Sequence, residues 1–193
     1  TFIKRNINMI TFKREYVKPV YDSKVISVYK DYLKTPDGNT VVYDYIHHKA
    51  GGGAGTLLVD EDENTYLVRL YRNSIDGLSL EMPAGGYNNP DESGDVCARR
   101  EAEEETGLRP TRMYHVANIV SSIGTFDEKT DIYIGTGIVK GVNKLDEDEF
   151  IDVVKLPVSE AIDKIYSGEI VDGKTVTALF AYEHMKREGI IEL

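Results

Sequence analysis

The feature that most constrains this chain is a cluster of four glutamates between positions 101 and 105. Glu101, Glu104 and Glu105 have the spacings i, i+3 and i+4, so a helix would gather their carboxylates on one face. Repulsion between like charges destabilises such a face unless solvent or a cation screens it. Hard divalent cations prefer oxygen ligands, which clustered carboxylates supply at one site. The cluster therefore indicates either a solvated surface helix or a site for Mg²⁺ or Mn²⁺.

Residues on both sides of the cluster predict where this helix begins and ends. The segment 90–93 has the composition of a helix start, and we expect the helix to run to about Thr106. Gly107 fits the position after the last turn, and Pro110 prevents continuation. Upstream, one proline and paired glycines make the segment 81–86 a predicted loop.

The spacing of these residues from position 86 to position 108 resembles the Nudix box. Box positions are filled by Gly86, Glu92, Arg100, Glu101, Glu104, Glu105 and Gly107. The resemblance implies hydrolysis of a nucleoside diphosphate linked to a further group, with Mg²⁺ or Mn²⁺ as cofactor. Chance agreement at this number of fixed positions is rare, so the cation site is preferred to the solvated helix.

The same resemblance assigns roles to the box residues. It implies that Glu101 and Glu105 ligate the metal directly and that Glu104 lies beside them as a ligand or water-orienting group. The backbone carbonyl of Ala84 resembles a further metal ligand of such enzymes. Arg100 has a rigid fork of donors, so it could hold Glu104 or Glu92 by a bidentate pair.

The general base of the family lies either in the box or in an acidic loop late in the chain. The run 146–149 matches that loop in position, and Glu147 and Glu149 are the candidates. A solvated acidic turn is the alternative interpretation for each of them.

Segments upstream of the box resemble those of ADP-ribose pyrophosphatases. Residues 69–72 look like their arginine-bearing strand, and residues 81–85 look like their Glu-x-Pro-Ala-Gly loop. The resemblance implies that Arg72 and Glu81 bind substrate. A structural ion pair between these two side chains is the alternative.

A second motif, at residues 168–175, fits the phosphate-loop pattern G-x-x-x-x-G-K-T. A true phosphate loop follows a strand of a parallel α/β sheet, whereas a helix is predicted before this one. We therefore expect a connector between two helices. The segment also resembles ADP-ribose pyrophosphatases and the related GDP-mannose pyrophosphatases. The chain departs from typical ADP-ribose pyrophosphatases at Ile123, where proline is usual.

The predicted elements follow an order typical of α+β proteins with a mixed sheet. The sequence predicts an extended arm at residues 1–22, hairpins at 25–47 and 56–71, and the acidic helix at 90–106. Three further strands are expected at residues 113–119, 131–139 and 150–156, and two closing helices at 157–167 and 175–187. The resemblance implies the Nudix α/β/α sandwich over residues 49–193. Residues 1–48 are expected to form a small N-terminal β extension, and the resemblance implies that this extension is used for homodimerisation.

Bulk properties exclude several classes of protein. The formal net charge of −10 argues against binding to nucleic acid, because phosphates require basic surface. No apolar run is long enough to span a bilayer, and no signal peptide is recognised, so no membrane partner is expected. The single cysteine, Cys97, excludes an internal disulfide. A cytoplasmic protein acting on a small molecule is the simplest expectation.

Two classes of function are compatible with these observations. The first is hydrolysis of ADP-ribose to AMP and ribose 5-phosphate, with GDP-mannose or another nucleotide sugar as an alternative substrate. The second is a non-catalytic Nudix domain that senses ADP-ribose-like ligands. Sensors can lose metal-binding glutamates, whereas this chain keeps all of them. The sequence therefore favours an enzyme.

Overall fold

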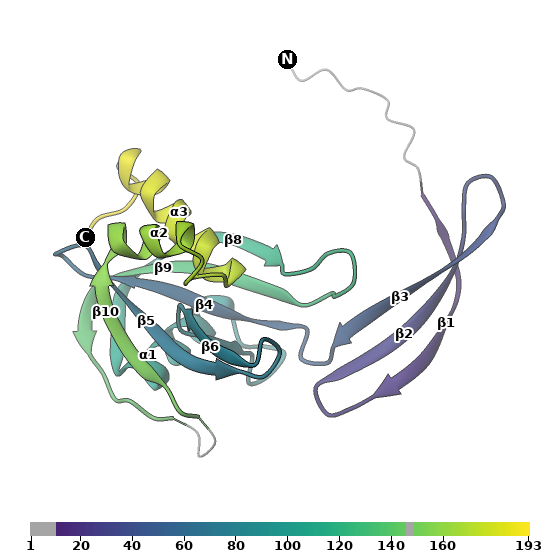
Figure 1. Cartoon of the computed structure of the whole chain (residues 1–193), viewed down its shortest axis with the longest axis horizontal. Coiled ribbons are helices and arrows are strands. Elements are labelled where there is room, and N and C mark those ends of the chain that lie inside the picture. Colours follow the sequence, from purple (N-terminus) through teal and green to yellow (C-terminus); the bar gives the residue numbers. More distant parts are fainter. Residues whose placement is uncertain (1–10, 146–148) are drawn as a thin grey trace. The chain divides into compact units, whose positions relative to one another are not determined.

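The computed structural model describes residues 11–145 and 149–193, which divide into two compact units (Figure 1). Within these residues, the first unit comprises the chain up to residue 49 together with residues 122–127. The second unit comprises residues 50–121 and 128–193. The segment 122–127 was expected to belong to the C-terminal domain, so its place in the first unit is a feature that the sequence did not predict.

The first unit is an antiparallel sheet in the order β1-β2-β3, formed by β1 (Lys13–Asp22), β2 (Ile26–Lys34) and β3 (Thr40–His48). The expected hairpin is β2 and β3. Residues 13–22, expected as an extended arm, pair with β2 along their length. Cross-strand stacking of Tyr16 on Tyr32, with ring centroids 4.2 Å apart, contributes to this pairing. Ile46 N donates to Thr125 O at 2.7 Å, which attaches the segment 122–127 to β3.

The second unit contains a mixed sheet of seven strands within the described residues. Its main path runs β10-β5-β4-β9-β8, with β6 beside β5 and β7 beside β4. Only the β4–β9 pair is parallel. The strands are β4 (Gly52–Val59), β5 (Asn64–Arg72), β6 (Gly77–Glu81), β7 (Ala84–Gly86), β8 (Leu108–Val120), β9 (Lys129–Lys140) and β10 (Asp152–Pro157).

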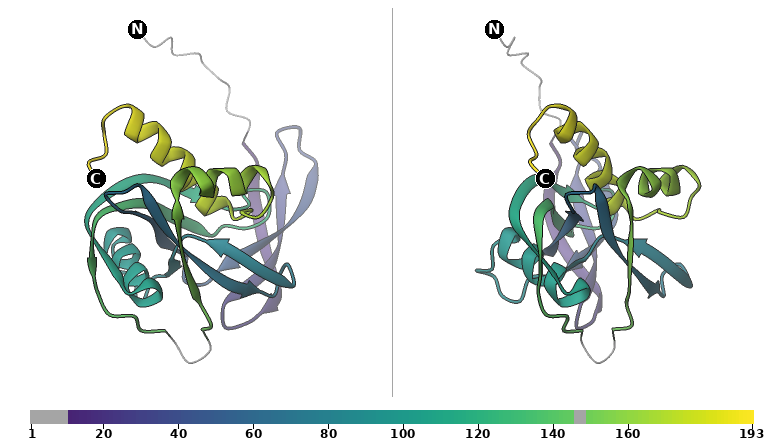
Figure 2. Two further views of the ribbon diagram at one scale, coloured as in Figure 1. Left: turned by 60° about the vertical axis from the view of Figure 1, so that its left-hand side comes forward. Right: turned by 90° about the vertical axis from the view of Figure 1, so that its left-hand side faces the viewer.

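Helices cover both faces of this sheet, so every residue of β4 is buried. Ala54 packs against Cys97 and neighbouring residues of α1 (Gly94–Thr106). Leu57 and Val59 point the other way, into a cluster with residues of α2 (Val158–Tyr166) and α3 (Gly173–Arg187). Figure 2 shows α1 and the α2–α3 pair on different sides of the sheet, which confirms the α/β/α sandwich. Among the described helices, none is both long and apolar enough to cross a membrane.

The prediction of a loop at residues 81–86 was wrong in part. Glu81 ends β6, and residues 84–86 form the short strand β7, antiparallel to β4. Likewise, β4 begins at Gly52, before the expected start at residue 56. Gly53 allows β4 and β7 to lie close together, because a Cβ at this position would lie 2.0 Å from the carbonyl oxygen of Gly85. The strand propensities of the residues do not predict strands that form through such close contacts between segments.

Candidate active site

Helix α1 presents the glutamate cluster, and its ends are those that the sequence predicted. Ser93 is the N-cap, and its side chain accepts a hydrogen bond from Val96 N at 3.5 Å. Gly107 adopts a left-handed conformation with φ of 70° and donates to Glu103 O. Ala98 and Ala102 are fully buried, which turns the opposite, charged side of the helix toward a cavity.

This cavity, of about 390 Å³, brings together five of the residues predicted for the site. They are Ala84, Arg100, Glu101, Glu104 and Glu149. Glu105 is not among the lining residues, but it contacts the loop that forms one wall. Glu147, the other candidate base, lies outside the described residues.

Arg100 organises the carboxylates at the mouth of the cavity. Its Nε donates to Glu92 at 3.0 Å, and its Nη1 donates to Glu101 at 2.5 Å and to Glu104 at 3.0 Å. Its Nη2 donates to the backbone carbonyl of Gly86 at 2.8 Å. The arginine therefore holds Glu92 and Glu104, the two partners that the sequence offered, and ties both to the glycine loop.

The loop between β6 and β7 lies directly against the helix carboxylates. Ala84 N donates to Glu105 Oε2 at 3.2 Å. A Cβ on Gly85 would lie 2.3 to 2.4 Å from the carboxyl atoms of Glu101. Only glycine permits this approach, so the backbone of the loop and the carboxylates form one surface.

Burial perturbs the carboxyl groups of this surface. Glu105 is only 6% exposed, and its burial, reinforced by the charge of Glu101, raises its pKa to about 8. The hydrogen bond from Ala84 acts in the opposite direction. Burial also raises the pKa of Glu101, although Arg100 opposes it. A positive charge close to Glu101 and Glu105 would offset the effect of burial and favour the ionised form of both carboxyl groups.

The donor set fits a hard divalent cation. Glu101 Oε2, Glu104 Oε1 and Glu105 Oε1 accept no hydrogen bond from the described residues, so each carboxylate keeps one oxygen open. In the described part of the chain, no three acidic, histidine or cysteine side chains already converge on one point. The Nη1 group of Arg100 donates to both Glu101 and Glu104, so one oxygen of each carboxylate is engaged with this arginine.

Arg72 and Glu81 form the ion pair that was the structural alternative to substrate binding. Arg72 Nε and Nη2 donate to the two oxygens of Glu81, both at 2.8 Å. The Glu81 side chain is 5% exposed and has a second cation, Lys174, at 3.5 Å. Neither member of the pair lines the cavity, but the charge of Arg72 acts to lower the pKa of Glu105. Their roles toward substrate stay predictions.

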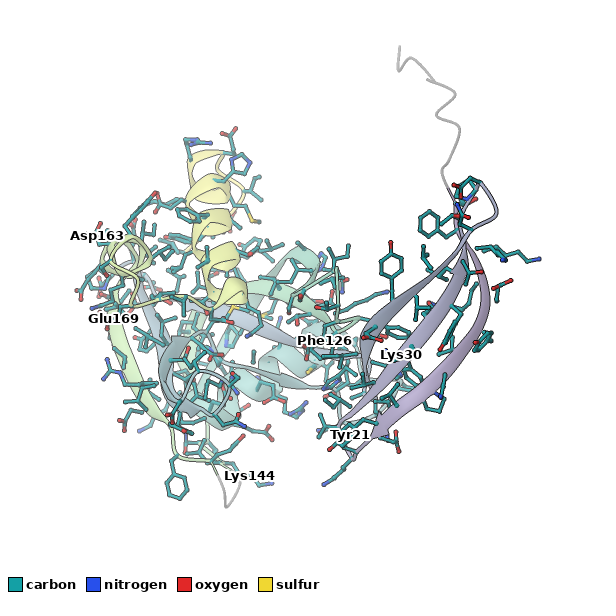
Figure 3. The ribbon with its side chains drawn as sticks, turned by 45° about the vertical axis from the view of Figure 1, so that its right-hand side comes forward. Tyr21, Lys30, Phe126, Lys144, Asp163 and Glu169 are labelled. Carbon is teal, nitrogen blue, oxygen red and sulfur yellow. The ribbon has the colours of Figure 1, made fainter. Side chains whose placement is uncertain are left out.

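Three lining residues were not predicted: Tyr87, Asn88 and Lys144. Tyr87 and Asn88 directly follow Gly86, so adjacency to the box was an available signal. Lys144, labelled in Figure 3, reaches the site because its backbone N–H donates to Glu104 O at 2.9 Å. That contact joins the chain after β9 to the end of α1, and no local pattern announces it.

Comparison with known proteins gives one matching family, the NUDIX domain, over residues 49–179. The chain is 31% identical over 162 residues to "Methanol dehydrogenase activator" of Bacillus methanolicus and 26% identical over 162 residues to "ADP-ribose pyrophosphatase" of Bacillus subtilis (strain 168). Each match covers 83% of this chain and 86% of the relative. Identity to "GDP-mannose pyrophosphatase" of Cronobacter sakazakii (strain ATCC BAA-894) is 32% over 178 residues, with the same coverage.

A solved structure shares the fold. It is described as "Crystal structure of ADP compounds hydrolase", with a TM-score of 0.80 and 22% sequence identity. The match covers 93% of this chain and 97% of that one.

Proposed function

Because this chain belongs to the Nudix hydrolase family, we propose that it hydrolyses the pyrophosphate bond of ADP-ribose, yielding AMP and ribose 5-phosphate. The match to the NUDIX family over residues 49–179 confirms the resemblance of the glutamate cluster to the Nudix box. The family assignment covers the reaction class, hydrolysis of a nucleoside diphosphate compound. ADP-ribose as the substrate, the requirement for a divalent cation and Mg²⁺ as that cation are the proposed parts.

The observation that carries the proposal is the set of open carboxylate oxygens against the loop backbone. Glu101, Glu105 and the carbonyl of Ala84 would hold the cation, with Glu104 beside them. A bound divalent cation supplies charge neutralisation at the pyrophosphate and lowers the pKa of a bound water. Mg²⁺ fits oxygen-only ligands, and Mn²⁺ is the alternative.

The remaining residues of the site would hold the carboxylates in place, accept a proton and bind a substrate phosphate. Arg100 donates to Glu101 and Glu104 through one nitrogen and so keeps the two carboxylates near each other, while each retains a second oxygen for the cation. Glu149 lines the same cavity and is the proposed proton acceptor for the attacking water. Arg72 keeps its Nη1 group outside the pair with Glu81 and is the proposed cation for a substrate phosphate.

Glu105→Gln tests the proposal. The substitution removes the charge but keeps the size, so it should lower kcat roughly a hundredfold or more while the protein stays folded. Release of phosphatase-sensitive product from ADP-ribose is the assay, in Mg²⁺ or Mn²⁺ and after exhaustive EDTA treatment. Turnover that survives EDTA would contradict the metal requirement.

Glu103→Gln is the matched control on the same helix. Glu103 Oε1 accepts from Val142 N at 3.2 Å, away from the cavity, and the amide oxygen of glutamine can keep that bond. We expect kcat to remain within about twofold of the wild type. A folded Glu105→Gln enzyme with near-normal kcat at saturating Mg²⁺ would remove Glu105 from the site.

The same assays distinguish the proposed function from the alternative functions. GDP-mannose hydrolysis would retain the metal site and change only the preferred substrate. A non-catalytic ADP-ribose sensor does not need the three open carboxylates. Their retention is what favours hydrolysis. Homodimerisation through the first unit and a cytoplasmic location stay predictions.

A further inference from the structure

The motif at residues 168–175 meets the active-site loop from the opposite side of the unit. Asp172 is the N-cap of α3, and its Oδ2 accepts from Thr175 N at 3.0 Å. The fully buried Thr175 hydroxyl donates to the same oxygen at 2.7 Å. That hydroxyl also accepts from the backbone N–H of Met82 at 2.8 Å. One side chain thus joins the start of α3 to a loop 93 positions earlier in sequence.

Met82 needs this partner because it has left the ladder of β6, which ends at Glu81. The residue is 1% exposed, so water does not reach it to satisfy the N–H. The carbonyl of the next residue, Pro83, accepts from Thr56 N at 3.1 Å. Thr175 and Thr56 therefore hold the backbones of two consecutive residues immediately before those that touch the helix carboxylates.

Charged groups extend the contact to Arg72. Lys174 Nζ donates to Asp172 Oδ1 at 2.6 Å and lies 3.5 Å from Glu81 Oε2. Glu81 in turn holds Arg72 by two bonds of 2.8 Å. Because the Glu81 carboxylate is buried between two cations, its geometry and that of Arg72 depend on the start of α3.

We propose that Thr175 is a positioning residue for the active site. It holds the loop so that Ala84 stays against Glu105, while Lys174 sets the orientation of Arg72 through Glu81. The part that concerns metal rests on the proposed function. The inference also explains the phosphate-loop pattern, since its lysine and threonine bond protein carboxylates and the loop backbone and are not presented to a phosphate.

Thr175→Val and Thr175→Ser separate positioning from packing. Valine keeps the shape and loses the hydroxyl, whereas serine keeps the hydroxyl. The probe is Mn²⁺ alone, titrated without substrate and followed by electron paramagnetic resonance of the free ion. Loss of a group that bonds a metal ligand directly weakens metal binding by about tenfold or more. Thr175 acts one step further out, through Met82, so we expect the Mn²⁺ affinity to fall by more than about twofold for valine and by less for serine.

Thr177→Val is the matched control. Thr177 lies one half-turn further along α3, and its hydroxyl donates only to Gly173 O of the same helix. Its Mn²⁺ affinity should equal that of the wild type. Thermal unfolding of all variants, measured in parallel, reports any loss of packing separately.

A Thr175→Val protein that melts earlier but binds Mn²⁺ and turns over as the wild type does would overturn the inference. If that variant does not fold, Lys174→Met takes its place: the KM for substrate should rise about fivefold with unchanged Mn²⁺ affinity, and an unchanged KM would overturn it. Wild-type protein that binds Mn²⁺ without hydrolysing ADP-ribose would instead reject the proposed substrate and leave the positioning test valid.

Discussion

Asp60 shows how a single side chain in the turn between β4 and β5 stabilises the second unit. It pairs with Lys155 at 2.8 Å and accepts from Asn64 N at 2.8 Å and from the Tyr66 hydroxyl at 2.9 Å. Burial disfavours its charged form, but these bonds outweigh burial and lower its pKa from 3.8 to about 2. The turn is therefore held by a carboxylate that must stay ionised.

This shift predicts a defined pH dependence of stability. The folded pKa lies below the unfolded value, so the contribution of Asp60 is complete above about pH 4 and is lost as the pH falls through 2. The difference corresponds to about 2 kcal/mol. Asp60→Asn should lower the free energy of unfolding by about that amount at pH 7, as measured by urea denaturation, and the difference should shrink toward pH 2. The exposed neighbour Asp62, changed to Asn, is the control; an equal loss there would contradict the assignment.

At the scale of elements, β4 depends on glycine at the points where it approaches β7. A Cβ on Gly53 would lie 2.0 Å from one backbone oxygen and 3.1 Å from the Cα of Gly86, so alanine there must displace a strand. Overpacking of this kind costs about 1 to 3 kcal/mol, which lowers the melting temperature of a unit of this size by about 5 °C. Gly77→Ala in β6 is the control, because its Cβ would meet only one atom, at 3.6 Å. Equal melting temperatures for the two variants would show that β7 accommodates the methyl group.

The elements that the sequence predicted well are those specified by local signals. Helix α1 was bounded correctly because Ser93 and Gly107 cap it within its own sequence, and its glutamates share a face because of helical spacing. Strand β7 and the first residues of β4 were missed because their pairing joins segments about 30 residues apart and uses glycines that strand propensity disfavours. Lys144 was missed for the same reason: its place in the site follows from a tertiary hydrogen bond.

At the scale of the whole molecule, the net charge of −10 opposes the approach of an anionic diphosphate. Selection of such a substrate therefore depends on local cations. Arg100 is committed to three glutamates, and Lys174 is committed to Asp172 and Glu81. Lys144 lines the cavity, and Arg72 retains one terminal nitrogen outside its ion pair. These last two are the cations that we propose for the substrate phosphates.

From this distribution we predict that ADP-ribose is hydrolysed with a higher kcat/KM than GDP-mannose or diadenosine polyphosphates. Arg72 offers a fork for phosphate or a flat face for stacking on the base, and Glu81 fixes its direction. Arg72→Ala should lower kcat/KM for ADP-ribose about tenfold or more without changing the Mg²⁺ dependence, because the arginine does not ligate metal. Arg109→Ala, at an exposed position on β8 that lines neither this cavity nor the neighbouring one beside Glu149, is the control and should retain the wild-type value. Competing substrates assayed side by side decide the preference: a tenfold advantage for GDP-mannose would reassign the substrate, and an unchanged Arg72→Ala enzyme would leave the Arg72–Glu81 pair with a structural role alone.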